Sequence, residues 1–152
     1  MARRAAWLVT CEHGGNRIPA AYRELFAPHA ARLASHRGWD PGALRLAEDL
    51  ARALDAPLVA TTVSRLLVEN NRSRHHPRLF SDVTRALPPE ERERILAHWW
   101  TPHRTAVEEE LARLGRGGRP VVHVAAHSFT PVLDGQVREV DVGFLYDPRR
   151  SF

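Results

Sequence analysis

The sequence predicts an α/β fold built on a parallel β-sheet. Two apolar stretches, residues 5–9 and 121–126, have the length and composition of buried strands, and each is followed by polar residues. A helix with one apolar face is predicted over residues 41–54, between the first stretch and another strand-like stretch at 56–62. This strand–helix–strand order is typical of a βαβ unit, whose two strands run parallel.

The composition fits one soluble domain. Of 152 residues, 43% are hydrophobic and 26% are charged, as in ordinary globular proteins long enough to bury a core. No apolar run approaches the ~20 residues of a membrane-spanning helix, and the N-terminus lacks the apolar core of a secretory signal. Cys11 is the only cysteine, which excludes an internal disulfide and a cysteine-rich zinc site. We therefore expect a cytoplasmic protein in which residues 1–152 form a single domain.

The charge pattern gives little support for nucleic-acid or membrane binding. The formal net charge is only +4, and all 22 basic residues are arginines spread along the chain. The sequence contains no long basic run and no basic patch interleaved with aromatic residues. We therefore expect neither nucleic acid nor a membrane as a partner.

The first strand leads into residues suited to chemistry. Glu12 and His13 follow it, and Gly14 and Gly15 come next. Polar residues before a glycine pair are how α/β enzymes present reactive groups at the carboxyl end of a strand, where glycine lets the backbone approach a ligand closely. A tight turn with a solvated His13 is the alternative. The second strand ends in His127, and the carboxyl ends of parallel strands meet at one edge, so we expect the two histidines to lie close together.

Asp40 precedes Pro41 at the predicted start of the helix over 41–54. Aspartate at the N-cap and proline at the first helical position are typical of a helix start, so Asp40 has a structural role of its own. Because a carboxylate has two oxygens, Asp40 can cap the helix and still bind a ligand.

Polar residues also crowd around a third short strand that we expect over residues 66–68. Arg65 precedes it, and Glu69, Asn71 and Arg72 follow it. The planar guanidinium group of arginine suits a substrate carboxylate, and the alternative is a solvated turn.

The remaining segments complete the α/β pattern. Residues 19–34 are expected to form short helical turns interrupted at Pro28. A helix is expected from 88 to 114, with a kink or restart at Pro102. The chain is then expected to return as a strand over 138–148.

Five blocks of sequence form a series that spans nearly the whole chain. They are Cys-Glu-His-Gly-Gly-Asn-Arg-Ile-Pro at 11–19, His-Arg-Gly-Trp-Asp-Pro-Gly-Ala at 36–43, Ser-Arg-Leu-Leu-Val-Glu-Asn-Asn-Arg-Ser at 64–73, His-Ser-Phe-Thr-Pro at 127–131 and Asp-Val-Gly-Phe-Leu-Tyr-Asp-Pro at 141–148. In this order they resemble the N-formylglutamate amidohydrolase family. Each block alone is a weak signal, but five in series are specific to that family.

The resemblance implies a fold and a reaction. Members of the family resemble zinc-dependent amidases and carboxypeptidases, in which a mixed, mostly parallel central sheet lies between helices in a three-layer sandwich. The family reaction is hydrolysis of the formamide of N-formyl-L-glutamate to formate and glutamate, a step in histidine degradation. A small acidic N-acyl amino acid is therefore the expected substrate.

The resemblance also implies which residues act. It places His13, Asp40 and His127 at a Zn²⁺ ion. Two imidazoles and one carboxylate leave a coordination position open for water, whose pKa the metal lowers while it polarises the amide carbonyl. The family positions suited to gripping the substrate carboxylates are Arg65, Asn71, Arg72 and Arg138.

Two acids are candidates for proton transfer. Glu12 lies beside His13 and is either a proton-transfer group or a carboxylate that orients a metal ligand. Asp141 is the second candidate. One local departure from the family pattern is that Glu69-Asn70-Asn71-Arg72 stands where Asp-Leu-Asn-Arg is expected.

A second departure from the family concerns length. Family members continue past the block at 141–148 with further strand and helix, including a glutamate that would be the general base in related zinc amidases. We therefore expect this chain to be short at its C-terminus relative to the family. The alternative functions are a truncated or non-catalytic metal- or ligand-binding domain of the same fold, and a zinc amidase that acts on another amide.

Overall fold

The computed structural model describes residues 4–133 and 135–147. Residues 1–3, 134 and 148–152 lie outside the described part, and with them the first residues of the chain and the last residue of the strand expected over 138–148. The strands are β1 (Ala6–Cys11), β2 (Leu58–Ala60), β3 (Val121–Ala125), β4 (Val132–Leu133) and β5 (Gln136–Val137).

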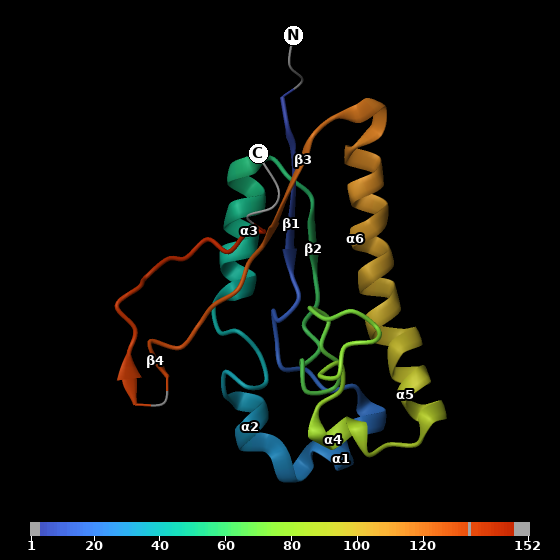
Figure 1. Cartoon of the computed structure of the whole chain (residues 1–152). Coiled ribbons are helices and arrows are strands. Elements are labelled where there is room, and N and C mark those ends of the chain that lie inside the picture. Colours follow the sequence, from blue (N-terminus) through green and yellow to red (C-terminus); the bar gives the residue numbers. More distant parts are fainter. Residues whose placement is uncertain (1–3, 134, 148–152) are drawn as a thin grey trace.

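The other regular elements are helices and helical turns (Figure 1). The α-helices are α1 (Arg23–Phe26), α2 (Ala30–Ala34), α3 (Ala43–Leu54), α4 (Asp82–Arg85), α5 (Pro89–Ile95) and α6 (Thr101–Leu114). The other helical segments are the 3-10 turns η1 (Ala20–Tyr22), η2 (Ala27–His29) and η4 (Arg116–Gly118), and the π-helical turn η3 (Leu96–Trp100).

The central sheet has the order β2-β1-β3, and both strand pairs are parallel. In the register, Val9 pairs with Leu58 on one side of β1, and Leu8 pairs with His123 on the other. The parallel sheet predicted from the βαβ pattern is confirmed. In the described part of the chain, antiparallel pairing is confined to the separate β4–β5 hairpin.

Helices flank the sheet, so the predicted layered α/β fold is confirmed. Because side chains alternate along a strand, Val9 and Cys11 of β1 point to one face. There they pack against an alanine stripe of α3, formed by Ala43, Ala47 and Ala51. Helix α6 contacts β1 and β2 and lies on the other side of the strands from α3 (Figure 1).

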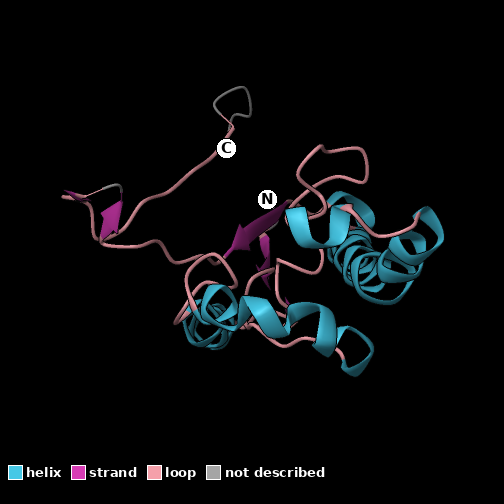
Figure 2. Ribbon diagram, turned by 90° about the horizontal axis from the view of Figure 1, so that it is seen from below, coloured by secondary structure: helices cyan, strands magenta, loops and turns pink. Residues whose placement is uncertain are grey.

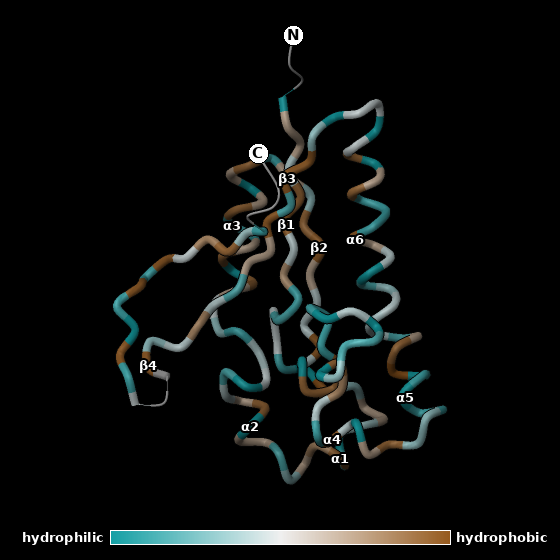
Figure 3. Tube along the Cα trace, in the orientation of Figure 1, coloured by the Kyte–Doolittle hydropathy of each residue, from teal (hydrophilic) through white to brown (hydrophobic). Residues whose placement is uncertain are grey.

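A second apolar cluster lies below the carboxyl ends of the strands. It joins η1 and α1 to α5 and to the turn after Val63. Its buried members are Tyr22, Phe26, Val63, Leu66, Leu67, Val68, Leu79, Ile95 and Leu96. The loop that follows this turn is largely hydrophilic, whereas the strands carry apolar residues along much of their length (Figure 3).

The strand expected over residues 66–68 is wrong. Leu66 and Leu67 lie in a turn, in which the N–H of Leu67 donates to the carbonyl of Ser64 at 2.9 Å. Both leucines are buried in the second apolar cluster. Three apolar residues in a row suit any buried segment, so periodicity does not distinguish a strand from a buried turn here.

The strand expected over 138–148 is also wrong for the described residues. Residues 138–147 have no regular secondary structure and are exposed. Instead, the chain after β3 forms the short β4–β5 hairpin, which projects away from the helices (Figure 2). The apolar residues of this stretch, such as Phe144 and Leu145, account for the strand prediction, but they lie in solvent.

The N-cap role predicted for Asp40 is wrong. Helix α3 begins at Ala43, and its N-cap is Gly42, whose φ of 81° suits glycine. The backbone carbonyl of Asp40 accepts the N–H of Ala43 at 3.1 Å, which leaves the carboxylate free of the helix.

The expected interruption before Pro102 is confirmed, and it has the form of a π-helical turn. Proline has no N–H to donate to the carbonyl four residues earlier, so the regular α-helical hydrogen bonding is interrupted there. The turn η3 fills this gap between α5 and α6. The short helical segments between Ala20 and Ala34 also match the prediction.

The glycine pair after β1 serves backbone packing. An added Cβ would lie 2.9 Å from the carbonyl oxygen of Thr61 at Gly14, and 2.7 Å from that of Thr62 at Gly15. The N–H of Gly14 donates to the carbonyl of Thr61 at 3.1 Å. The close approach predicted for a ligand is therefore made by the chain after β2. Separately, no helix of the described chain has the length and apolarity needed to cross a membrane.

Candidate metal centre

Three side chains from distant parts of the sequence meet at the carboxyl edge of the sheet. His13 follows β1, His127 follows β3, and Asp40 lies before α3. One potential ligand atom from each side chain lies within 4.8 Å of the other two. His13 and Asp40 are buried, and the side chain of His127 is 32% exposed, so the group is open to solvent on one side.

Backbone hydrogen bonds hold these three residues in place. The N–H of Asp40 donates to the carbonyl of His13 at 3.0 Å, which joins the loop before α3 to the end of β1. The N–H of Ala126, next to His127, donates to the carbonyl of Thr10 at 2.8 Å and extends the β1–β3 pairing by one residue. The parallel sheet therefore positions both histidines.

Each histidine presents its Nδ1 atom to the same oxygen. Oδ2 of Asp40 lies 3.2 Å from Nδ1 of His13 and 2.9 Å from Nδ1 of His127. The two imidazole rings are 4.9 Å apart between centroids. The donor atoms that converge are thus two imidazole nitrogens and one carboxylate oxygen.

The Nε2 atoms point outward, toward two further carboxylates. Nε2 of His13 contacts Oε1 of the buried Glu69. Nε2 of His127 lies 3.6 Å from Oε2 of Glu12, which is also buried. Metal-bound histidines usually present their second nitrogen to a carboxylate or carbonyl, and this arrangement fixes which nitrogen binds the metal. The arrangement therefore favours Nδ1 of both histidines as the metal-binding atoms.

The charges in this group stabilise one another. Burial raises the pKa of Asp40, but hydrogen bonds from His127 and His13, with the charge of Arg65, outweigh it and hold that pKa well below its usual value. Burial likewise opposes ionisation of Glu69, yet His13 and Arg65 lower its pKa to about 2. Burial lowers the pKa of His13, but its hydrogen bonds with Asp40 and Glu69 raise that pKa by more, so the net shift is upward. Both acids are therefore carboxylates at neutral pH and available as acceptors.

Glu12 borders a polar layer between the sheet and α6. Its Oε1 lies 3.9 Å from Nε2 of the buried His103 on α6, and its Oε2 has no hydrogen-bond partner among the described residues. On the same face, Oγ1 of Thr10 lies 2.9 Å from Nε2 of His123. Glu12 is thus a buried carboxylate with one oxygen that faces His127; burial raises its pKa, but hydrogen bonds from His103 and Thr10 outweigh burial and lower that pKa to about 2.

The structure brings two of the four predicted substrate-binding residues to the group. Arg65 pairs with Oδ1 of Asp40 at 3.2 Å and with Oε2 of Glu69 at 2.7 Å. Nδ2 of Asn71 lies 3.4 Å from Nε2 of His127. Arg65 already neutralises two buried carboxylates, whereas the exposed Asn71 faces the open side of the group.

Within the described chain, no hydrogen bond or ion pair joins the side chains of the other predicted residues to the group, although the N–H of Arg72 donates to the carbonyl of Glu69 at 3.1 Å. Arg72 is exposed, and its carbonyl accepts a hydrogen bond from the Trp100 indole at 3.0 Å. The guanidinium carbon of Arg138 lies 5.1 Å from the ring centre of Phe129, beyond β5. Asp141 is exposed on the irregular segment 138–147.

Comparison with known proteins identifies the family of this chain. The profile of the family described as N-formylglutamate amidohydrolase matches residues 5–151. The chain belongs to this family. It is 28% identical to an N-formylglutamate deformylase from Pseudomonas aeruginosa, over 92% of this chain and 59% of that protein. It is also similar to the crystal structure of gene product Atu2144 from Agrobacterium tumefaciens, with a TM-score of 0.84 and 35% identity over 96% of this chain and 61% of the other.

The chain spans about three-fifths of the length of the relatives it matches.

The sequence indicated that Glu69 belongs to a polar cluster, but it did not assign Glu69 a role at the site. Its contact with His13 joins residues that are 56 positions apart, so no local spacing reveals it. The available signal was an acid directly after a buried apolar run.

Proposed function

We propose that this protein is a zinc-dependent amidohydrolase that cleaves the formyl amide of N-formyl-L-glutamate or a related N-acyl amino acid. The observation that carries the proposal is the convergence of one ligand atom each from His13, Asp40 and His127 within 4.8 Å. Family membership supports the reaction class, and the name of the Pseudomonas relative, a deformylase, supports the formyl group.

The donor set fits Zn²⁺. Zinc takes nitrogen and oxygen ligands at about 2.1 Å, which places neighbouring donors about 3.4 Å apart in a tetrahedral site. The observed separations of 3.2 Å and 2.9 Å between Nδ1 atoms and Asp40 Oδ2 are close to that spacing. When bound, zinc supplies Lewis acidity, which polarises an amide carbonyl and acidifies water.

The remaining residues would bind and orient the substrate. We assign the substrate carboxylates to Arg65, Asn71, Arg72 and Arg138, of which Asn71 has the most direct support because its amide faces His127 on the exposed side. Because Arg65 is already paired with Asp40 and Glu69, binding of a substrate carboxylate would depend on Arg72 and Arg138 as well.

Glu12 is the better supported of the two acids predicted for proton transfer. It is buried, and its Oε2 faces Nε2 of His127 at 3.6 Å, whereas Asp141 is exposed. The same position suits a carboxylate that only orients His127. The variant Glu12→Gln separates these roles: loss of zinc affinity indicates orientation, and loss of turnover with zinc retained indicates proton transfer.

The test of the proposed function combines zinc content with formate release from N-formyl-L-glutamate. Wild-type protein is expected to hold about one zinc per chain and to release formate, and His127→Gln is expected to lose both. His98→Gln is the matched control, because His98 is an exposed histidine whose Nδ1 lies 2.8 Å from the carbonyl of Arg94 in its own helix. Turnover that survives in His127→Gln would contradict the proposal.

A second candidate function is a non-catalytic metal- or ligand-binding domain of the same fold. It is favoured by the positions of Arg138 and Asp141, which lie on exposed chain apart from the histidines. Zinc bound without formate release would support this alternative. Release of a different acid from other N-acyl amino acids would instead support a zinc amidase with another substrate.

A further inference from the structure

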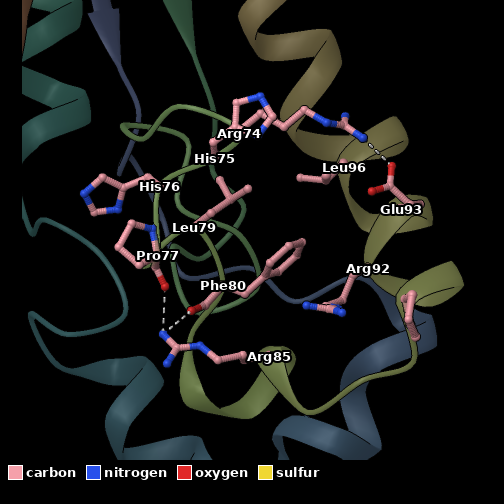
Figure 4. A pocket seen from close by; sticks show the side chains of 11 residues that line it. Arg74, His75, His76, Pro77, Leu79, Phe80, Arg85, Arg92, Glu93 and Leu96 are labelled. Carbon is pink, nitrogen blue, oxygen red and sulfur yellow. Dashed lines mark hydrogen bonds and ion pairs between the residues drawn. The ribbon is translucent and has the colours of Figure 1, made fainter.

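A separate pocket lies between the loop over residues 74–80, the end of α4 and helix α5 (Figure 4). Its volume is about 400 Å³, within the size range of small-molecule sites. None of the residues that line it belongs to the group formed by His13, Asp40 and His127. The proposed amidohydrolase function therefore gives this pocket no role.

The pocket combines apolar walls with arginines. Leu79, Phe80 and Leu96 contribute apolar surface, and Leu79 and Leu96 are buried. The arginines in its lining are Arg74, Arg85 and Arg92. Apolar walls with a few charged groups are typical of sites that bind an organic ion.

Only one of these arginines is neutralised by a carboxylate. Arg74 pairs with Glu93 at 2.6 Å, the one acid in the lining. The guanidinium of Arg85 donates to two backbone carbonyls, those of Pro77 at 3.1 Å and Phe80 at 3.2 Å. These carbonyls fix the position of Arg85, and they leave its charge without a counter-ion among the described residues.

Arg92 is the least satisfied group in the pocket. Its Nε atom is buried and has no hydrogen-bond partner among the described residues. Its guanidinium carbon lies 5.9 Å from the centre of the Phe80 ring, a cation–π distance (Figure 4). A guanidinium group without a carboxylate partner in the described chain favours an anionic ligand beside it.

Two acids on the neighbouring helices, Asp82 and Glu91, are paired with cations outside the pocket lining. Asp82 of α4 is held by Arg32 at 2.6 Å, and Glu91 of α5 is held by Arg94 at 3.0 Å. Each therefore has a cationic partner of its own. The pocket is left with a net positive charge next to an apolar surface.

We propose that this pocket binds a small organic anion, with one carboxylate or phosphate group on an apolar body. Arg92 is the principal contact of the anionic group and Arg85 the second, because both are cations without a carboxylate partner in the described chain. The apolar body packs on Phe80 and Leu96. An aromatic body fits best, since the Phe80 ring lines the pocket and aromatic rings pair favourably.

The pocket is also linked to the candidate metal centre. The carbonyl of Leu79, in the pocket wall, accepts the N–H of Glu69 at 2.9 Å, and Glu69 contacts His13. The binding test is therefore done on metal-free protein dialysed free of chelator. Its result is then independent of the zinc site and of the proposed activity.

The experiment measures binding of phenyl phosphate, benzoate, inorganic phosphate and benzyl alcohol by calorimetry. We expect at least one of the two aromatic anions to bind, more tightly than inorganic phosphate, while benzyl alcohol gives no detectable heat. The comparison of phenyl phosphate with benzoate identifies the preferred anionic group. Chemical shifts of the backbone amides are expected to change mainly within residues 74–96.

Variants then test the role of Arg92. Arg92→Gln is expected to weaken binding at least tenfold, and Arg92→Lys to restore part of it because the charge is kept. Arg104→Gln is the matched control and is expected to bind normally. Arg104 also has a buried Nε without a partner and lies 5.9 Å from a ring centre, that of Trp100, but outside the pocket. Circular dichroism confirms that each variant is folded.

Three results would overturn the proposal. The first is the absence of binding for both aromatic anions in wild-type protein. The second is an equal loss of affinity in Arg92→Gln and Arg104→Gln, which would place the effect outside the pocket. The third is a set of amide shifts centred on His13 and His127 instead of the loop over 74–80.

Discussion

The two histidines of the candidate metal centre each face a carboxylate, but one carboxylate contacts its histidine more closely than the other. Glu69 touches Nε2 of His13 and accepts the backbone N–H of Asn71 at 3.0 Å. Glu12 stands 3.6 Å from Nε2 of His127 and has one oxygen without a partner in the described chain. Glu69 is therefore the more rigid of the two, and His13 the more firmly oriented histidine.

We predict that Glu69→Gln weakens zinc binding by roughly 10- to 100-fold, the usual cost of removing a carboxylate behind a metal-bound histidine. The neutral amide accepts a weaker hydrogen bond from His13 and no longer balances its charge. Competition with a chromophoric zinc chelator measures the affinity. Glu110→Gln, which alters a partly exposed acid paired with Arg113, should leave the affinity unchanged. Equal affinity in both variants would remove the orienting role of Glu69.

A second prediction concerns Arg65, the cation shared by Asp40 and Glu69. Arg65→Gln should lower the free energy of unfolding of metal-free protein at pH 7 by about 1–3 kcal/mol, less than the loss of a fully buried pair, because the arginine is partly exposed. Urea unfolding measures this value. Arg45→Gln on α3 removes an exposed pair with Asp49 and should cost less than about 1 kcal/mol. An equal cost in both variants would show that the buried carboxylates do not depend on Arg65.

At the scale of single elements, the predictions were correct where the spacing of apolar residues distinguishes a helix from a strand, and wrong where it does not. Helix α3 was predicted because its alanine stripe repeats at helical spacing, and the parallel strands because a helix lies between them. The segment 66–68 failed because its three apolar residues are buried in a turn. The segment 138–147 failed because its apolar residues have no partner strand in the described chain.

Helix α5 is joined to η1 by a hydrogen bond whose strength depends on pH. The Tyr22 hydroxyl donates to Glu91, and burial, followed by this bond and the Glu91 charge, raises the pKa of Tyr22 to about 12. The pKa in the unfolded chain is about 10. Between these values the unfolded state loses the phenol proton while the folded state keeps it, so stability is full below pH 10 and falls as pH rises toward 12.

We predict that Tyr22→Phe removes this loss of stability between pH 10 and pH 12. The variant should be less stable than wild type at pH 8, by about 1.5–3 kcal/mol for one hydrogen bond to a charged acceptor, and the difference should narrow from pH 10 upward. Urea unfolding at several pH values measures the effect, and the absorbance of tyrosinate assigns the titration. A difference in stability that stays constant from pH 8 to 11 would contradict the raised pKa.

The turn after β1 gives another prediction at this scale. Gly15→Ala should destabilise the fold by several kcal/mol, because its Cβ would lie 2.7 Å from the rigid carbonyl of Thr62. Gly42→Ala should cost only about 1–2 kcal/mol, since φ is positive there but nothing lies within 4 Å of the added carbon. Urea midpoints of the two variants provide the comparison. A smaller loss at Gly15 than at Gly42 would show that the turn can shift away from the chain after β2.

On the scale of the whole molecule, the sequence predicted the meeting of His13 and His127, because two parallel strands that end in histidine bring their carboxyl ends together. Asp40 was included through the family resemblance, and its contact with both histidines agrees with that inclusion. Glu69 could not be assigned in this way, because it follows the segment 66–68. The apolar pattern predicts a strand there, but the structure has a buried turn. Long-range contacts made by turns are the part of a site that local patterns do not encode.

The last prediction follows from how the candidate metal centre ties the molecule together. A zinc ion held by His13, Asp40 and His127 would link the ends of β1 and β3 to the start of α3, and it would bind only the folded chain. At 100 times the dissociation constant, such binding adds about 2.7 kcal/mol to the free energy of unfolding, or roughly 5–10 °C in melting temperature for a chain of this size. Thermal unfolding of metal-free protein with and without added zinc measures the shift, which His127→Gln should abolish and His98→Gln should retain. The same shift in both variants would mean that zinc stabilises the protein somewhere other than at this group.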